Sequence, residues 1–300
     1  MKEAQFFEKL DQNKVHPVRD RLVNRELVSN RVHCNLCPQS CIIPPDKTGF
    51  CRVRKNIRGE LYSLIYEEAT SISLDPIEKK PLYHYHPKEF ILSVGTRGCN
   101  LACQFCQNWE IAQVSDAPTQ KITPEFIIQE AKRLNSFGIA YTYNEPFIWY
   151  EFVYDTAKMA RDQGLENVLV TNGFVNKEPL EKILPLIDAM NIDLKSIDEL
   201  FYEKYCFGRL APVLETIKLS QKHCHIELTN LVIPTLNDCD ENFIGLVNWV
   251  YENLGRDVPL HFSRYFPCYK MTLPPTPVET LKRAHQIAKE KLKYVYLGNV

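Results

Sequence analysis

Three cysteines lie close together in the stretch GCNLACQFCQNW, as Cys99-x3-Cys103-x2-Cys106. Thiolates are the normal ligands of a [4Fe–4S] cluster, and three of them leave one of its four irons without a protein ligand. The amino and carboxylate groups of S-adenosylmethionine (SAM) can occupy that open iron. An electron passed into the sulfonium then breaks a C–S bond and yields a 5′-deoxyadenosyl radical. The spacing predicts such a catalytic cluster at Cys99, Cys103 and Cys106.

Zinc is the main alternative for this loop. A structural zinc site takes four ligands, and no fourth Cys or His lies inside the loop. A zinc ion with an open position would be hydrolytic, but no H-E-x-x-H element accompanies the loop. Coincidental clustering of three cysteines is the remaining alternative.

A second group of cysteines, Cys34-x2-Cys37-x3-Cys41-x9-Cys51, supplies four thiolates, enough to close a metal site. A structural zinc would stabilise a small, loop-rich region that cannot build a core of its own. An auxiliary [4Fe–4S] cluster would be fully ligated and able to pass electrons. The spacing is compatible with both metals, and a metal-free region is the third option.

Strand-like and helix-like segments alternate over the rest of the chain. The expected strands are 90–95, 139–143, 167–171, 189–194, 225–233, 259–265 and 294–297. The expected helices are 123–136, 148–163, 177–186, 212–222, 241–253 and 277–290. Strand alternating with helix predicts an α/β fold with a parallel sheet. Seven strands favour a full or partial (β/α) barrel, with its chemistry at the carboxyl ends of the strands.

The N-terminal part does not follow this alternation, which divides the chain into 1–75, a helical and four-cysteine metal-binding region, and 76–300, the barrel core. Residues 1–30 are expected to be helical, and 61–66 and 70–74 to be short strands. Two helix starts carry local signals. Thr123-Pro124 offers an N-cap followed by proline, and Thr276-Pro277-Val278-Glu279 offers a capping box.

Composition excludes several classes of protein. The chain has 300 residues and a formal net charge of −1, which argues against a dedicated nucleic-acid binder. No apolar run is long enough for a transmembrane helix, and the N-terminus lacks the apolar core of a signal peptide. We therefore expect a cytoplasmic protein with no membrane partner, in which clustered cysteines bind metal rather than form disulfides. The isolated Cys206, Cys224, Cys239 and Cys268 are expected to be core residues.

The cysteine loop resembles the C-x3-C-x2-C signature of radical SAM enzymes, including the aromatic Phe105 before the last cysteine. The resemblance covers the chain from about residue 65 onward and points to the branch that contains the pyruvate formate-lyase activating enzymes. Within that branch the chain is most similar to the radical enzyme of the AmmeMemoRadiSam system. The stretches that carry this match are DPIEKKPLYHYHP, YTYNEP, VTNGF, NIDLKS and YKMTLPPTPVET. The resemblance implies SAM, an electron donor such as ferredoxin or flavodoxin, and a substrate that can be a protein.

The strand ends supply candidate residues for holding SAM. In the family, the end of the second strand carries a Gly-Gly-Glu-type motif that meets the methionyl amino group, and Asn144-Glu145-Pro146 stands there in this chain. The Glu145 carboxylate suits that group, and the backbone at Tyr143 and Asn144 offers acceptors. The alternative is a plain turn with a surface glutamate.

Thr171 and Asn172 end the third strand, where their side chains can bond ribose hydroxyls or the methionyl carboxylate. A simple Thr-Asn-Gly turn is the alternative. In the resembling activating enzymes an aspartate precedes this turn, whereas Val170 stands here, which puts a monovalent-cation site in doubt.

Asp193 and Lys195 end the fourth strand on one face, where Lys195 can bind the SAM carboxylate while Asp193 orients it; a structural salt bridge is the alternative. His261 and Arg264 have a spacing that places them on opposite faces of the sixth strand, and Arg264 is the preferred site residue.

The leading hypothesis is a radical SAM enzyme that abstracts hydrogen from a protein. The second keeps this chemistry but acts on a small molecule. The third is a non-catalytic, zinc-binding interaction protein.

Overall fold

The computed structural model describes residues 1–10 and 30–300. Within those ranges eight strands form the main sheet, in the order β16-β15-β14-β13-β12-β11-β9-β8. Their bounds are β8 Ser71–Pro76, β9 Phe90–Gly95, β11 Gly138–Tyr141, β12 Glu166–Thr171, β13 Ala189–Asp193, β14 His225–Val232, β15 Leu260–Arg264 and β16 Val295–Gly298. All neighbours pair in parallel except β8, which is antiparallel to β9. Because β8 and β16 lie at opposite ends of this order, the sheet is a partial barrel, and the expected α/β barrel class is confirmed.

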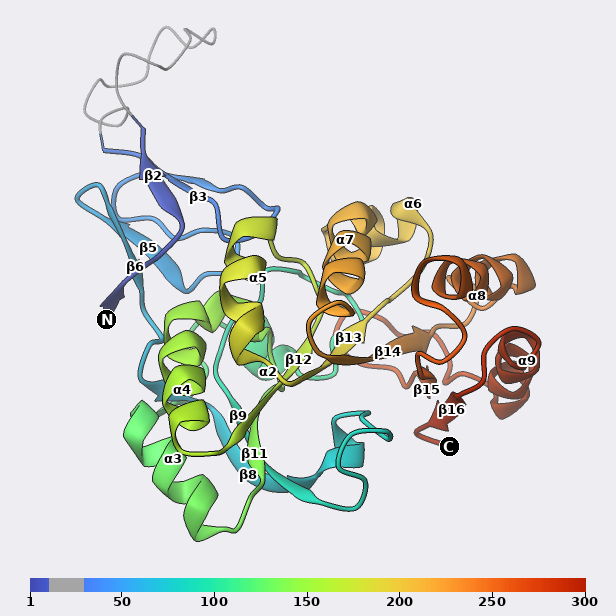
Figure 1. Ribbon diagram of the computed structural model, residues 1–300. Helices are drawn as coiled ribbons and strands as arrows, with labels where there is room; N and C mark the ends of the chain where they lie inside the picture. Colours follow the sequence, from blue (N-terminus) through green and yellow to red (C-terminus); the bar gives the residue numbers. More distant parts are fainter. Residues whose placement is uncertain (11–29) are drawn as a thin grey trace, which may run out of the picture.

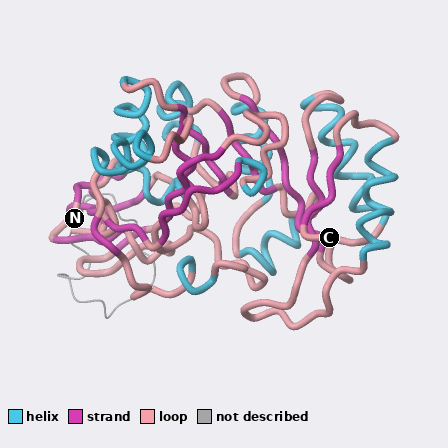
Figure 2. The backbone as a smooth tube through the Cα atoms, turned by 90° about the horizontal axis from the view of Figure 1, so that it is seen from below, coloured by secondary structure: helices cyan, strands magenta, loops and turns pink. Residues whose placement is uncertain are grey.

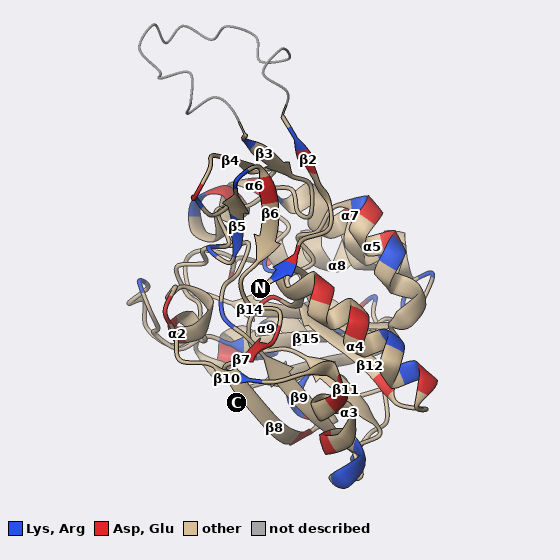
Figure 3. Ribbon diagram, turned by 90° about the vertical axis from the view of Figure 1, so that its left-hand side faces the viewer, with Lys and Arg blue, Asp and Glu red and all other residues tan. Residues whose placement is uncertain are grey.

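Helices cover the outer face of this sheet (Figures 1 and 2). They are α3 Pro124–Arg133, α4 Tyr150–Asp162, α5 Lys177–Ile183, α7 Leu210–Ser220, α8 Asp240–Leu254 and α9 Val278–Lys289. Charged residues lie along the exposed sides of α3, α4, α5 and α7 (Figure 3), as expected for amphipathic helices that pack one face on a sheet. No helix of the described ranges is long and apolar enough to cross a membrane.

The two helix-start signals have different outcomes. Thr123 caps α3 as expected, because its Oγ1 accepts a hydrogen bond from the Phe126 amide at 3.2 Å and Pro124 begins the helix. The capping box at Thr276 is wrong. The Thr276 hydroxyl is buried and instead donates to the Val232 carbonyl (2.6 Å) while accepting from the Tyr265 amide (3.0 Å). The Thr276 side chain therefore connects β14 to the end of β15 and does not cap the following helix.

The N-terminal region forms small antiparallel sheets beside the barrel. One contains β1 Lys2–Glu3, β6 Glu60–Ser63 and β5 Arg54–Ile57, and another contains β2 Phe7–Lys9, β3 Val32–Cys34 and β4 Ile42–Ile43. A short pair joins β7 Glu68–Ala69 to β10 Gln120–Lys121. The expected helix at 1–30 is wrong for residues 1–10, because these pair with strands some 25 to 60 residues away, a contact that local periodicity does not reveal. The rest of that expected helix, 11–29, lies outside the described residues.

A buried ion pair ties the N-terminal region to the barrel. Arg54 on β5 and Glu151 on α4 are each 1% exposed. The Nη1 of Arg54 lies 3.0 and 3.1 Å from the two Glu151 oxygens, and the Gln5 amide donates to the same carboxylate at 2.8 Å. Both charges are therefore matched at a position where an unpaired charge would be costly.

The segment between β8 and β9 runs from β8 toward the far strands of the sheet (Figure 1). The Pro81 carbonyl accepts from Asn191 on β13 (2.8 Å), and the His84 amide donates to Glu227 on β14 (2.7 Å). The His84 ring lies 2.7 Å from the Tyr296 hydroxyl on β16. We call residues 77–89 the crossing segment. It links β8 at one edge of the sheet to β16 at the other.

Glu227 is the buried anchor of this arrangement, and it predicts a pH dependence of stability. Burial alone would raise the pKa of Glu227, but hydrogen bonds from His225, His261 and the amides of His84 and Tyr83 lower it to about 2. A carboxyl with a lowered folded-state pKa stabilises the fold above its unfolded pKa, and that stabilisation is lost as pH falls from about 4.5 toward 2. We expect Glu227→Gln to lower the free energy of unfolding at pH 7 by about 2–3 kcal/mol.

Denaturant unfolding at pH 7 and pH 4 measures this effect. The difference between wild type and Glu227→Gln should shrink at pH 4, while exposed Glu241→Gln should match wild type at both values. A Glu227→Gln protein as stable as wild type at pH 7 would contradict the anchoring role.

Candidate functional site

The three-cysteine loop directly follows β9, at the carboxyl end of the sheet. The Cys99, Cys103 and Cys106 side chains line a cavity of about 590 Å³, a volume within the range of small-molecule sites. The loop backbone is held by the π-helix η4 (Tyr202–Cys206), since the amides of Ala102 and Gln104 donate to carbonyls of η4 at 3.0 and 2.9 Å. π-Helical turns often occur at functional sites.

The Cys99 sulfur already accepts two hydrogen bonds. The Leu101 amide donates at 3.4 Å and the Asn172 side chain at 3.6 Å. Burial and the neighbouring Glu145 carboxylate raise the pKa of Cys99 well above its usual value, and burial raises that of Cys106 to about 12. A cationic metal must therefore displace the thiol protons when it binds.

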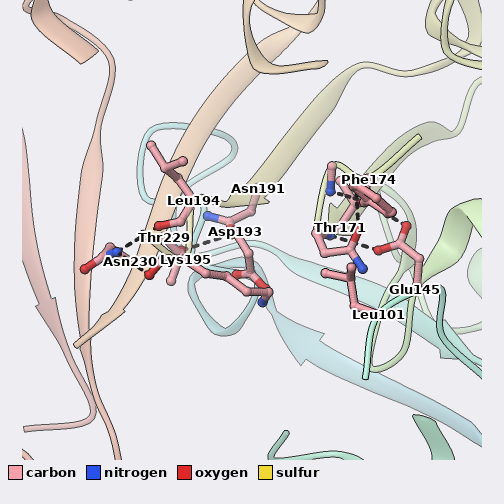
Figure 4. Close-up of polar contacts among 12 residues, drawn as sticks. Leu101, Glu145, Thr171, Phe174, Asn191, Asp193, Leu194, Lys195, Thr229 and Asn230 are labelled. Atoms are coloured by element: carbon pink, nitrogen blue, oxygen red, sulfur yellow. Dashed lines mark hydrogen bonds and ion pairs between the residues drawn. The ribbon is translucent and has the colours of Figure 1, made fainter. Parts of the chain in front are cut away.

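Glu145 organises the ends of β11 and β12 (Figure 4). Its carboxylate accepts from the Thr171 hydroxyl at 2.7 Å, the Asn172 amide at 2.9 Å and the Phe147 amide at 3.0 Å. The side chain is buried and lines the cavity, so it is not the surface glutamate of a plain turn. An ionised carboxylate has about four acceptor positions, which leaves one for a ligand donor.

Asn144 clamps the loop that carries the cysteines. Its Oδ1 accepts from the Thr96 amide at 3.0 Å and its Nδ2 donates to the Gly98 carbonyl at 3.0 Å, on either side of Arg97. Tyr143 lies in the left-handed region, with φ of 72°, and its hydroxyl donates to Asp75 on β8 at 2.6 Å. Such a backbone is uncommon for an aromatic residue and occurs where surrounding structure holds it.

Asp193 and Lys195 lie together at the end of β13, with Nζ and Oδ2 2.8 Å apart (Figure 4). Burial alone would lower the pKa of Lys195, but the Asp193 carboxylate raises it well above its usual value, so the amine is cationic. The Asn230 side chain donates to the carbonyls of Leu194 and Lys195 at 2.8 and 3.1 Å, which fixes this turn. Both members of the pair line the cavity, so the ion pair and a binding role are compatible.

The structure places Arg264 differently from expectation. Its Nε donates to the Thr276 carbonyl at 2.7 Å and its guanidinium stacks on Phe266, whereas the residue does not line the cavity. Its strand neighbour His261 points into the cavity instead, against Tyr83 of the crossing segment. The alternation of strand faces is correctly predicted, but the choice between the two faces is not.

The remaining expected site residues gather around one cavity. Besides the three cysteines, these are Tyr143, Asn144, Glu145, Thr171, Asn172, Asp193 and Lys195. Residues that the sequence did not single out complete its walls, among them Lys80, Thr229, Ser263 and Asn299. Lys80 and Tyr83 belong to the motif DPIEKKPLYHYHP, which the sequence analysis singled out only for its family resemblance. The motif does not reveal that this segment packs against β13 and β14.

Two isolated cysteines lie beside the three-cysteine loop. Cys206 is buried, as expected for a core residue, but its thiol is hydrogen-bonded to Cys103. The Cys268 sulfur lies 3.5 Å from the Cys106 carbonyl. Cys224 is half-buried and Cys239 is exposed, so a core position does not hold for Cys239.

The four N-terminal cysteines also come together. Cys34, Cys37, Cys41 and Cys51 line a separate, much smaller cavity of about 10 Å³. Among the described residues, no three His, Cys, Asp or Glu side chains are arranged to hold a single metal ion. Both cysteine sets instead surround open space.

The donors around the large cavity fit a [4Fe–4S] cluster and SAM. Cys99, Cys103 and Cys106 would hold the cluster, Glu145 would accept from the SAM amino group, and Lys195 would meet its carboxylate. When bound, the two together supply one-electron cleavage of a C–S bond. The protein's own groups bind, orient and exclude water around that chemistry.

Glu145 gives a testable pH dependence of SAM binding. Burial raises its pKa to about 7, despite hydrogen bonds from Asn172, Phe147 and Thr171. Only the ionised carboxylate is a full acceptor for an amino group, so its contribution to affinity grows as pH rises through 7. We expect the affinity ratio of wild type to Glu145→Gln to increase about tenfold from pH 6 to pH 8.

Calorimetric titration of both reconstituted proteins with SAM measures this ratio. Any change in the protonation of free SAM with pH affects both proteins equally and therefore cancels in the ratio. The exposed Glu110→Gln variant serves as the control. A ratio that does not change with pH would mean that Glu145 does not meet the cosubstrate.

Comparisons with known proteins identify the family of this chain. The family model described as "Radical SAM superfamily" matches residues 93–247. The "Uncharacterized protein MJ0808" of Methanocaldococcus jannaschii is 47% identical over 305 residues, covering 100% of this chain and 86% of that protein. The pyruvate formate-lyase-activating enzyme of Clostridium pasteurianum is 24% identical over 164 residues, covering 51% of this chain and 66% of the enzyme.

Solved structures share the fold. Streptococcus suis SuiB bound to S-adenosylmethionine superposes with a TM-score of 0.55 at 15% identity, over 70% of this chain and 52% of that one. The hydrogenase maturase HydG gives 0.52 at 13% identity, over 68% of this chain and 50% of that one. The chain thus spans about half the length of these structures. The family match covers more than half of the chain and includes the cysteine loop, so this protein belongs to the radical SAM superfamily and is related to the pyruvate formate-lyase activating enzymes.

Proposed function

We propose that this protein cleaves SAM reductively at a [4Fe–4S] cluster held by Cys99, Cys103 and Cys106, and that the resulting 5′-deoxyadenosyl radical abstracts hydrogen from a substrate. The observation that carries the proposal is the shared cavity. The three thiols, the Glu145 acceptor and the Asp193–Lys195 pair line one space at the carboxyl end of the sheet.

The test is anaerobic reconstitution with iron and sulfide, reduction, and addition of SAM. We expect release of 5′-deoxyadenosine and methionine. An iron-replete, reduced sample that releases neither would overturn the proposal. The non-catalytic zinc protein considered from the sequence would behave in that way.

We extend the proposal to a protein substrate. The cavity is lined from both edges of the open sheet, by Lys79 and Lys80 after β8 and by Gly298 and Asn299 at the end of β16. A site that reaches both edges of an open sheet suits an extended chain segment. The relatives named as activating enzymes, including one named for 4-hydroxyphenylacetate decarboxylase, support the same class. The finer assignment to the AmmeMemoRadiSam system stays a prediction.

Deuterium transfer separates this substrate class from a small molecule. An extract of cells grown in heavy water is divided by size, and each fraction is mixed with the reduced enzyme and SAM. Deuterium in 5′-deoxyadenosine from the macromolecular fraction, sensitive to protease treatment, supports the proposal. Deuterium that comes only from the small-molecule fraction contradicts it.

A further inference from the structure

One corner of the large cavity lies across the sheet from the residues that would hold SAM. Asp193, Thr229, His261 and Tyr296 pair in register on the neighbouring strands β13 to β16, so their side chains share one face of the sheet. Parallel strands are about 4.8 Å apart, which places His261 roughly 10 Å from Asp193. Thr229 and His261 both line the cavity, and we call these two residues the far corner.

A carboxylate fixes the protonation of one nitrogen of the His261 ring. The Nε2 of this buried histidine lies 2.6 Å from Oε2 of Glu227. Glu227 is ionised at neutral pH because hydrogen bonds lower its pKa to about 2. An ionised carboxylate only accepts hydrogen bonds, so Nε2 carries the proton. In the neutral ring, Nδ1 then keeps its lone pair and can only accept.

The orientation of the His261 ring is fixed on both faces. Tyr83 of the crossing segment contacts it edge to face, with ring centroids 4.7 Å apart, and Tyr296 stacks on it at 5.2 Å. Its Nδ1 has no hydrogen-bond partner among the described residues, and it is not one of their enclosed polar atoms without a partner. This acceptor is therefore open to the cavity that His261 lines.

Thr229 supplies a second acceptor beside the first. It lies next to Asp193 on β14 (Figure 4), and its hydroxyl donates to Oδ1 of Asn191 at 3.0 Å. The proton of the hydroxyl is thus in use, whereas a hydroxyl oxygen has two acceptor lone pairs. The far corner therefore presents two acceptors on adjacent strands.

The charges around the far corner also favour a donor over an anion. The two buried lysines of the cavity are already paired: Lys80 lies 2.7 Å from Asp75, and Lys195 lies 2.8 Å from Asp193. The ionised Glu227 lies directly behind the His261 ring. An anionic group in this corner would meet lone pairs and a nearby negative charge, whereas an N–H or O–H group would meet two acceptors.

We propose that the far corner recognises the substrate, with Nδ1 of His261 and Oγ1 of Thr229 accepting hydrogen bonds from its N–H or O–H groups. Glu227 is a positioning residue that holds the ring in the required tautomer. A substrate that places only acceptors here, such as a carboxylate or an ester, would leave both protein acceptors unpaired and is rejected. This recognition role rests on the proposed function, whereas the geometry of the His261 ring does not.

The ring geometry is tested by NMR of the metal-free protein carrying ¹⁵N-labelled histidine, at pH 8. We expect one ring whose Nε2 is protonated and whose Nδ1 is not, and we expect its signals to be missing from His261→Phe. A His261 ring with its proton on Nδ1 overturns the proposal. No cluster or SAM is present, so this result does not depend on the proposed function.

Recognition is tested with His261→Phe and with His225→Phe as the matched control. Both histidines are hydrogen-bonded to Glu227, but only His261 lines the cavity. The probe is the fraction of the heavy-water cell extract that transfers deuterium to 5′-deoxyadenosine with wild type. At limiting amounts of this fraction, we expect His261→Phe to lower deuterium transfer by roughly 10- to 100-fold and His225→Phe to leave it close to wild type.

Cleavage of SAM without extract is measured in the same variants. His261→Phe should still form 5′-deoxyadenosine, because the far corner does not hold SAM. Equal losses of deuterium transfer in the two variants, or an equal loss of cleavage without extract, overturn the recognition role. Failure of the proposed function is distinguishable, since wild type itself would then form no 5′-deoxyadenosine.

Thr229 provides a second pair of variants, which decides the matter should His261→Phe not fold. Thr229→Val keeps the shape of the side chain but removes the hydroxyl, whereas Thr229→Ser retains it. We expect deuterium transfer to fall in Thr229→Val and to be retained in Thr229→Ser, with SAM cleavage without extract unchanged in both. Equal deuterium transfer in the two variants overturns the proposal.

Discussion

The Cys103→Ala substitution is expected to abolish 5′-deoxyadenosine formation. The Cys206→Ala substitution, at the hydrogen-bonded neighbour, is expected to preserve it. Both thiols are buried, and they contact each other. Only Cys103 lines the cavity with Cys99 and Cys106. Loss of an outer-shell partner at a metal site lowers metal affinity or activity by roughly 10- to 100-fold. Loss of a direct ligand should lower activity further.

The pair makes a stringent comparison because the two substitutions remove the same atoms from nearly the same place. Cys206 contributes its carbonyl oxygen to the Ala102 amide, and alanine keeps that hydrogen bond. Iron content, the EPR spectrum with and without SAM, and product formation are measured for both variants. If Cys206→Ala lost the cluster as completely as Cys103→Ala, the ligand assignment would be wrong.

Glutamine at position 151 is expected to lower the free energy of unfolding by about 3–5 kcal/mol, the cost of leaving one member of a buried ion pair unmatched. Glu151 has both carboxylate oxygens on Arg54 and also accepts from the Gln5 amide. A neutral amide cannot balance the guanidinium, which is 1% exposed. The loosened contact should release the N-terminal region from α4.

A double variant is the control for this prediction. Arg54→Met with Glu151→Leu removes both charges and should recover much of the lost stability, because replacing a buried pair by apolar residues is often neutral. Denaturant unfolding of the two single variants and the double variant gives the coupling energy. Additive effects would mean that the pair does not act as a unit.

The repeating part of the fold was predictable from local pattern. The strand 90–95 has its expected bounds, and the helix and strand centres of the barrel agree because each element has one apolar side that packs on the sheet. The gathering of Cys99, Cys103 and Cys106 at one cavity was predictable for a different reason: the three thiols lie within one short segment, so spacing alone brings them together.

What escaped prediction depends on contacts between distant segments. Residues 2–3 and 7–9 form strands because partners near residues 62 and 34 complete their sheets. Thr276 caps no helix because the Val232 carbonyl lies nearby. The sequence favoured Arg264, whereas His261 lines the cavity. His261 packs there against Tyr83 of the crossing segment, and the position of that segment cannot be read from local periodicity.

The crossing segment also sets the order in which the protein can be made. The hydrogen bond between His84 and Tyr296 joins residues 212 positions apart, and closing such a long loop is entropically costly and slow. Synthesis proceeds from the N-terminus, so β8 to β13 emerge well before β16. Until then the cavity lacks the wall that Ser263, Gly298 and Asn299 provide. The complete cavity therefore forms only after nearly the whole chain has emerged, so full enclosure of a ligand in this cavity is a late step in biogenesis.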